Sequence, residues 1–375
     1  MRLSSFLVLV APLTLPGCLE DHCTADDPCY DVTTLSYHAN PVASTSAAGR
    51  FVAYDDHDFV IRGSLVGERP TPLGDGDSLA VASDGSDHVL LVRDRGRLLS
   101  RRVSDGTSHL LAAYDYVMSP PAASIVVAKD GYAAAWTPEG YGPGTGFVAR
   151  LARSGEVVGG PWQVSATGVV DRGLRVAADS AGVIAVWTET HEDLPPDLHV
   201  RRIANDGTLG PDVVRGHALA GAIIAGDSGF VLASITDAGI VIAEHLDREL
   251  AAVGAPLTIA DAYDDVGVEG EVAVAGEPGA FAVQYTSAHG STNGIPGPRK
   301  PFVKVVIGDA VGSRIDLGSV PGRAHAALLT GHAGVFHALW NEYRTVPTGP
   351  ESYDEYLELF QATLRLDGTT IEPIL

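Results

Sequence analysis

The segment Leu174-Arg-Val-Ala-Ala178, Asp179-Ser-Ala-Gly182, Val183-Ile-Ala-Val-Trp187 has the pattern of two β-strands joined by a tight turn. Small apolar and β-branched residues fill its two outer parts, and Asp and Gly between them are typical turn residues. Downstream, residues 198–203 predict a third strand, Asn205-Asp206-Gly207 a second turn, and Val213-Val214 a fourth strand. The segment therefore predicts a meander of four short antiparallel strands.

The same pattern returns along the chain. The other copies lie at residues 42–54, 79–92, 125–136, 222–234, 272–285 and 326–340. We mark each copy by the residue that ends its second strand, and these markers are Tyr54, Val92, Trp136, Trp187, Ser234, Tyr285 and Trp340. Neighbouring markers are 38 to 55 residues apart. Four strands in a unit of this length are typical of propellers, in which each sheet buries its faces against its neighbours.

We therefore predict an all-β fold, a β-propeller with seven four-stranded blades, with six blades as the nearest alternative. Helical solenoids are excluded because no segment keeps an apolar spacing of three and four residues. One β-sandwich of this length would be unusual. The first strand of each copy is rich in Ala and Val, which suits inner strands that converge on a narrow axis.

The composition fits an ordered globular protein with many turns, because 45% of the residues are hydrophobic and the chain has 43 Gly and 23 Pro. The formal net charge of −22 argues against a nucleic-acid partner, since phosphate backbones need clustered Lys and Arg. We expect no nucleic acid among the partners, and a monomer.

The first 17 residues have the form of an export signal. Arg2 precedes an apolar stretch at residues 3–15 that is too short for an ordinary membrane-spanning helix. Leu15-Pro16-Gly17-Cys18 then resembles the lipobox of bacterial lipoproteins, although Pro16 departs from the usual pattern. The resemblance implies that Cys18 is lipidated and anchors the mature protein, because more than one acyl chain binds a bilayer stably. We expect an exported protein of the bacterial cell envelope, at the periplasmic or surface face of the outer membrane.

Residues 18–39 are predicted to form an acidic tether and residues 40–375 the propeller domain. Cys23 and Cys29 are expected to form a disulfide bond in an oxidising compartment, with a metal site that includes His22 as the alternative. Residues 32–37 are expected to add an extra edge strand.

In a propeller of this kind the short turns after the first and third strands share one rim, which we call the plain rim. The other connections share the opposite rim, which we call the elaborated rim because it carries insertions at residues 138–146, 189–197, 287–301 and 342–355. Loops on a rigid scaffold are frequent binding sites. The candidate binding residues on this rim are Trp136, Glu139, Tyr141, Trp187, Glu189, His191, Glu192, Tyr285, His289, Trp340, Glu342, Tyr343 and Arg344. Aromatic rings beside carboxylates suit sugar rings or peptides, whereas packing between blades is the alternative role for the aromatic residues.

No serine-hydrolase elbow, zinc-protease motif or P-loop is present, and the signatures of WD40 and kelch repeats are absent. We therefore predict no catalytic residue, no cofactor and no metal site. The acidic segment 188–193 contains possible metal ligands but is expected to be solvated, and His325, His332 and His337 are expected to be structural.

The sequence predicts a non-catalytic, membrane-anchored binding module that takes a protein or glycan partner through the elaborated rim. Two alternatives remain. One is a glycan hydrolase or lyase at the same rim, with acids such as Glu139, Glu189, Glu192 or Glu342, and the other is a purely structural envelope protein.

Overall fold

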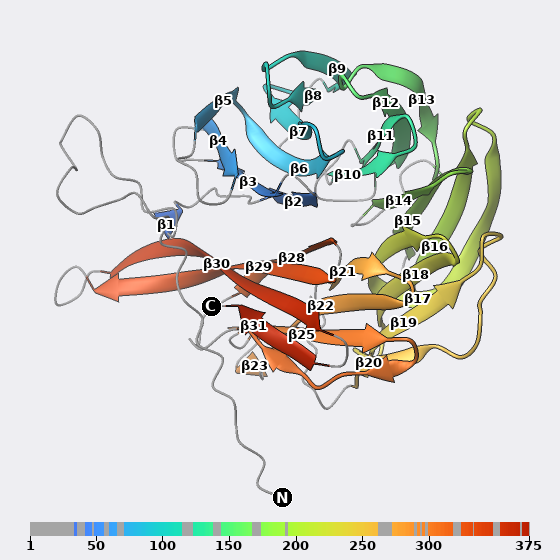
Figure 1. Ribbon diagram of the computed structural model, residues 1–375, viewed down its shortest axis with the longest axis vertical. Coiled ribbons are helices and arrows are strands. Elements are labelled where there is room, and N and C mark those ends of the chain that lie inside the picture. The colour runs from blue at the N-terminus through green and yellow to red at the C-terminus, as the bar shows by residue number, and fades with distance from the viewer. Residues whose placement is uncertain are drawn as a thin grey trace, which may run out of the picture.

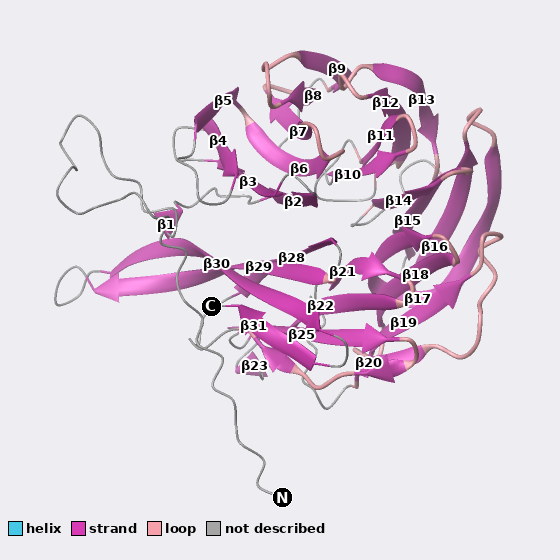
Figure 2. Cartoon of the chain, viewed as in Figure 1, coloured by secondary structure: helices cyan, strands magenta, loops and turns pink. Residues whose placement is uncertain are grey.

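The computed structural model is an array of antiparallel sheets (Figures 1 and 2). It describes residues 34–35, 42–46, 49–55, 60–65, 71–114, 123–137, 144–166, 174–191, 194–261, 272–288, 291–292, 295–296, 299–317, 324–332, 334–347, 353–367 and 370–374. Within these ranges every regular element is a strand. A search of the described residues for a helix that is long and apolar enough to cross a membrane finds none.

The strands pair as meanders of neighbours in the sequence. Blades one to three consist of β2 (Val42–Ser46), β3 (Gly49–Asp55), β4 (Val60–Leu65) and β5 (Thr71–Asp75); of β6 (Asp77–Ser83), β7 (His88–Asp94), β8 (Arg97–Arg102) and β9 (Ser108–Ala113); and of β10 (Ala123–Ala128), β11 (Gly131–Trp136), β12 (Phe147–Ala152) and β13 (Val157–Gln163). Blades four and five share the series β14 (Arg175–Asp179), β15 (Gly182–His191), β16 (Leu194–Ala204), β17 (Leu209–Gly226), β18 (Gly229–Thr236), β19 (Val241–Leu246) and β20 (Leu257–Ala260).

The last two blades follow the same rule. Blade six consists of β21 (Val272–Glu277), β22 (Ala280–Ala288) and β25 (Arg299–Ile307), with β26 (Ala310–Val311) and β27 (Ile315–Asp316) both paired to β25. Blade seven consists of β28 (Ala324–His332), β29 (Val335–Pro347), β30 (Tyr353–Asp367) and β31 (Thr370–Ile374). The short strands β23 (Ser291–Thr292) and β24 (Ile295–Pro296) form a separate two-stranded sheet.

Strand β17 belongs to two blades. Its first part pairs with β16 as far as His217, and its second part pairs with β18 from Ala218 onward. Gly216, with a φ of +99°, lies at the passage from one blade to the next, where the backbone needs a conformation that side chains disfavour. The outer strand of blade four therefore continues directly into the inner strand of blade five.

The inner strands close a ring. Each contacts the next in the order β2, β6, β10, β14, β17, β21 and β28, and β28 contacts β2 again. The predicted all-β propeller is confirmed, and strand pairing within the described ranges gives seven meanders around this ring.

The apolar cores lie between blades. Trp187 of β15 shares one apolar cluster with Ala133 and Ala135 of the preceding blade, and Trp136 shares another with Leu91 of its own preceding blade. Because each sheet is too small to bury its own faces, contacts of this kind between neighbours supply most of the apolar burial.

A repeated cation also joins neighbouring blades. Arg101 of β8 donates from Nη1 to the carbonyl oxygen of Leu73, 3.0 Å away in the preceding blade. Arg201 of β16 and Lys304 of β25 donate likewise to the carbonyl oxygens of Val164 and Ile259. All three cations pair with the residue two positions before the marker of their blade. Blades two, four and six therefore dock onto the preceding blade through an equivalent hydrogen bond.

Three of the insertions that we expected to be loops continue the ladder of their blades. Strands β15 and β16 pair out to His191 and Leu194, strands β22 and β25 pair out to Ala288 and Arg299, and strands β29 and β30 pair out to Pro347 and Tyr353. The hairpin of β29 and β30 projects beyond the blades in Figure 1. These parts of the elaborated rim are extended hairpins, which hold their residues in a fixed register.

The expected extra edge strand forms as β1 (Thr34–Leu35), which pairs with β30 through Thr34 and Glu358. Strand β31 pairs with a later part of β30, from Thr363 onward. The beginning of the described chain is therefore attached to the projecting hairpin of blade seven.

Candidate functional site

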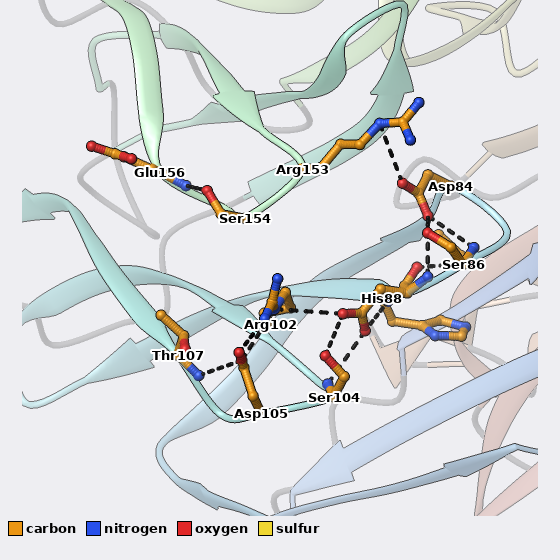
Figure 3. Close-up of polar contacts among 12 residues, drawn as sticks. Asp84, Ser86, His88, Arg102, Ser104, Asp105, Thr107, Arg153, Ser154 and Glu156 are labelled. Carbon is orange, nitrogen blue, oxygen red and sulfur yellow. Dashed lines mark hydrogen bonds and ion pairs between the residues drawn. The ribbon is translucent and has the colours of Figure 1, made fainter.

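A cluster of acids on the plain rim of blade two serves turn structure (Figure 3). Asp84 Oδ1 accepts hydrogen bonds from the backbone and hydroxyl of Ser86 at 2.9 and 2.7 Å, and its Oδ2 lies 3.7 Å from Arg153 Nε of blade three. Asp105 pairs with Arg102, and this hydrogen bond, together with the backbone amide of Thr107, holds the pKa of Asp105 far below its usual range. Because these carboxylates accept bonds from their own turns, we assign them to turn closure.

Four of the predicted aromatic residues are buried. Trp136, Trp187, Tyr285 and Trp340 are at most 2% exposed and pack in the cores between blades. Their ring faces are therefore not available to a ligand, and we assign them to blade packing, which corrects their place among the candidate binding residues.

The other predicted rim residues divide into three groups. Glu189 and His191 are described and lie in blade four. Glu342, Tyr343 and Arg344 form part of β29, paired with Glu358, Leu357 and Tyr356, but their side chains lie outside the description. Glu139, Tyr141, Glu192 and His289, as well as Cys18, Cys23 and Cys29, lie outside the described residues.

Blade four brings charged side chains together on its face toward blade three. We call this group the blade-four cluster, and its members are Trp187, Glu189, His191, Asp197, His199, Arg201, Asp212 and His217. They come from β15, β16 and β17, at positions that alternate toward one face of the sheet. The cluster combines three carboxylates, three imidazoles, one guanidinium and the indole of Trp187.

The inner part of the cluster is a connected chain of polar contacts. Trp187 Nε1 donates to Glu189 Oε1 at 2.9 Å, and Glu189 Oε2 lies 3.6 Å from His199 Nε2. His199 Nδ1 lies 2.9 Å from Asp212 Oδ1, and Arg201 Nη2 lies 3.2 Å from Asp212 Oδ2. The side chains of Glu189 and His199 are only 10% and 9% exposed, so the expectation that the acidic segment 188–193 is solvated is wrong at Glu189, which lies within the ladder of β15 and β16.

The outer part of the cluster reaches the solvent. Asp197 accepts from His191 Nε2 at 3.0 Å and from His217 Nδ1 at 2.8 Å, so one carboxylate joins two histidines from different strands. The side chains of His191 and His217 are 38% and 51% exposed. A ligand at the elaborated rim would therefore meet fixed imidazoles and a fixed carboxylate.

His199 departs from the repeat. It pairs across the strands with the marker Trp187, and the residue that pairs with the marker in five other blades is Leu99, Phe147, Ile242, Phe302 or Phe360. Blade one has Arg62 at this position. His199 stacks on Trp187 with ring centroids 5.3 Å apart, as Phe147 stacks on Trp136 at 6.0 Å. It therefore keeps the packing role of the position and adds two ring nitrogens.

The sequence interpretation included Trp187, Glu189 and His191 but missed Asp197, His199, Arg201, Asp212 and His217. His199 needed the strand register, because the residue that pairs with the marker follows it by 7 residues at Leu99 and by 20 at Phe360. Asp212 and His217 needed the strand register, since the sequence does not show how β17 continues into the next blade.

Comparison with known proteins concerns the fold alone. No protein-family model matches the chain, and no curated protein sequence matches it. A chain of the mitotic checkpoint complex is similar over 98% of this chain and 98% of its own length, with 11% identity and a TM-score of 0.50. The six-bladed β-propeller lectin of the fungus Aleuria aurantia is similar over 92% of this chain and 96% of its own, with 11% identity and a TM-score of 0.47. SapL1 lectin, solved with alpha methyl fucoside, covers 75% of this chain and 98% of its own, with 12% identity and a TM-score of 0.45.

Proposed function

We propose that this protein is a non-catalytic binding module that takes a neutral glycan at the elaborated rim of blade four. The observation that carries the proposal is the outer part of the blade-four cluster, where Asp197 fixes His191 and His217 at the solvent boundary. Sugar hydroxyls both donate and accept, so they can bind to a carboxylate and to imidazoles in one site. Groups that already hold one another in place lose little freedom when a ligand binds.

Two features favour a neutral ligand that is recognised through hydrogen bonds. The net charge of −22 repels anionic polymers at long range. Trp187, the aromatic residue of this cluster, is fully buried and offers no stacking face. Recognition would therefore depend on the hydroxyl pattern of the sugar.

The membrane anchor is a second part of the proposal. Cys18 would carry the lipid, and the tether would connect it to the propeller. At about 3.3–3.6 Å per residue, the 16 residues from Cys18 to β1 span up to roughly 55 Å. That reach would leave the rim free to meet a ligand away from the bilayer. A Cys18→Ser protein is expected to leave the membrane fraction, and unchanged partitioning would refute the anchor.

The glycan proposal is tested with the mature chain and a panel of neutral glycans that includes fucosides. Binding is expected, and Asp197→Asn should weaken it at least about tenfold, because a hydrogen bond to a charged group contributes about 1.5–3 kcal/mol. Asp309→Asn, an exposed acid in the β25–β26 turn, is the matched control and should bind as the unmodified chain does. If Asp197→Asn and Asp309→Asn bind the glycan equally well, the binding site does not lie at the rim of blade four. If the partner proves to be a protein, the glycan proposal is wrong. If free sugar is released, the protein is a hydrolase and not a non-catalytic binding module.

A further inference from the structure

We propose that His199 and Glu189 are ligands of a divalent transition-metal ion, with Zn²⁺ as the best match, held between blades three and four. The proposed ion lies at the inner part of the blade-four cluster, apart from the residues of the glycan proposal. The two ring nitrogens of His199 have different neighbours there.

The hydrogen bond to Asp212 fixes the tautomer of His199. A carboxylate only accepts, so Nδ1 carries the hydrogen that bridges the 2.9 Å to Asp212 Oδ1. In the neutral imidazole, Nε2 then holds a lone pair. This atom is buried and has no hydrogen-bond partner among the residues that the structure describes. Its lone pair is available to a metal.

The nearest charged atom to that lone pair is itself electron-rich. Glu189 Oε2 lies 3.6 Å from His199 Nε2, and both side chains are nine-tenths buried or more. Two such atoms facing each other away from water are unfavourable unless a cation lies between them. The arrangement therefore calls for a positive charge at this point, which either a proton on Nε2 or a bound metal ion would supply, and the metal titration below distinguishes the two.

The spacing agrees with two ligands of one metal ion. Zinc binds imidazole nitrogen and carboxylate oxygen at about 2.0–2.2 Å. Two ligands at such distances, with an angle of about 110–120° at the metal, are about 3.4–3.7 Å apart. The 3.6 Å between Nε2 and Oε2 lies within this range.

Both ligands are oriented by further groups. Trp187 Nε1 holds the other oxygen of Glu189, and Asp212 holds the other nitrogen of His199 while it is itself paired with Arg201. Carboxylates behind a metal-bound histidine are typical of metal sites and fix the ring orientation. Among the described residues, Glu189, His199 and Asp212 also have atoms of the kinds that can bind a metal within 4.8 Å of one another.

The ligand set selects the class of metal. One imidazole and one carboxylate suit Zn²⁺ and its transition-metal neighbours, whereas Ca²⁺ and Mg²⁺ prefer sites built from oxygen. Two protein ligands leave two positions of a tetrahedral ion for water or for an added ligand. Two of the coordination positions of the ion would therefore hold ligands that can exchange with the solvent.

The test titrates Zn²⁺ into the chelator-treated mature protein, with no glycan present, and follows heat and metal content. One saturable site is expected. His199→Phe should lower the affinity at least tenfold and keep the fold, because Phe147 and Phe302 occupy the equivalent position. Glu189→Gln should also weaken binding, and Asp212→Asn should weaken it about 10–100-fold.

The control is the double variant His191→Asn, His217→Asn, which removes two nearby histidines and should leave the affinity unchanged. Cobalt supplies a second readout, since an imidazole and carboxylate site gives visible d–d absorption without the strong thiolate bands that Cys23 and Cys29 would add. No saturable binding, equal binding by His199→Phe, or loss of binding in the double control would each overturn the metal site. Because the titration needs no glycan, its failure would leave the glycan proposal in place, and the reverse also holds.

Discussion

Acid is expected to weaken the seam between blades seven and one through a single histidine. His337 of β29 has its Nδ1 2.9 Å from Arg50 Nη1 of β3 and 2.9 Å from Thr363 Oγ1 of β30. A guanidinium only donates, so Nδ1 accepts and the imidazole is neutral. Burial, followed by the positive charge of Arg50, lowers the pKa of His337 to about 4. Protonation would therefore place two positive charges together at the point where the ring closes.

The magnitude follows from the difference between the two states. The unfolded chain has a histidine pKa of about 6.5, so between pH 6.5 and pH 4 it binds more protons than the folded chain. The stability associated with His337 is complete above pH 6.5 and is lost as the pH falls toward 4. With folded and unfolded pKa values of about 4 and about 6.5, the loss is about 1.4 kcal/mol at pH 5.5 and about 2.5 kcal/mol at pH 4.5. Partial solvent contact screens the charges, so these are upper limits.

Urea unfolding at pH 7, 5.5 and 4.5 measures this effect. His337→Gln cannot take up a proton in this range, so the unmodified chain should lose up to about 2.5 kcal/mol more than the variant between pH 7 and 4.5. The comparison cancels the acid sensitivity of the other carboxyl and imidazole groups. His217→Asn, which changes an exposed histidine, is the control and should follow the unmodified chain. If the unmodified chain and His337→Gln lose stability in parallel, the assignment of His337 to the seam is refuted.

Three further changes test the packing. Trp187→Ala should lower the free energy of unfolding by about 3–5 kcal/mol in urea unfolding, because it empties a buried site between two blades, and a loss below about 1 kcal/mol would contradict that burial. Arg101→Met should lower the free energy of unfolding by about 1–3 kcal/mol with an unchanged denaturant slope, because the carbonyl oxygens of Leu73 and Asp75 lose their donor. An unchanged free energy of unfolding would show that water replaces the guanidinium. Gly131→Ala should depress the melting temperature much more than Gly85→Ala. An added Cβ at Gly131 would lie 2.1 Å from a carbonyl oxygen, whereas an added Cβ at Gly85 would have no atom within 4 Å. Equal melting temperatures of the two variants would contradict the close contact at Gly131.

The fold was predictable because each copy of the repeat has the same short sequence pattern of strands and turns. Turn residues and apolar runs recur at each copy, and all seven markers lie on the second strand of their blade, from Tyr54 on β3 to Trp340 on β29. The Ala and Val of the first strands also lie where expected, on the inner strands of the ring. Such features depend on residues that are close together in the sequence of one copy, so a single sequence shows them directly.

Features that depend on contacts between copies were not predictable in the same way. The hydrogen bond from Arg201 to Val164 joins residues of two blades, and its counterpart at Arg101 becomes visible only when the third strands are aligned by register. The sequence pattern predicts loops for the rim insertions, yet β15 and β16 pair out to His191. Pairing across strands overrode the local preference there.

The departure of blade four from its own repeat is the strongest physical reason to place a function there. Packing explains Trp187, which fills the same space as Trp136. Packing does not require His199, because a phenylalanine at that position would bury more apolar surface and no polar atom. Glu189 Oε1 accepts the hydrogen bond of Trp187 Nε1, but a neutral Gln could do the same, so packing does not require the charge on Glu189, whose Oε2 faces a ring nitrogen 3.6 Å away. Local rules are broken at a stability cost mainly where a site needs the residue, so the polar pair in this core position supports the proposed metal site.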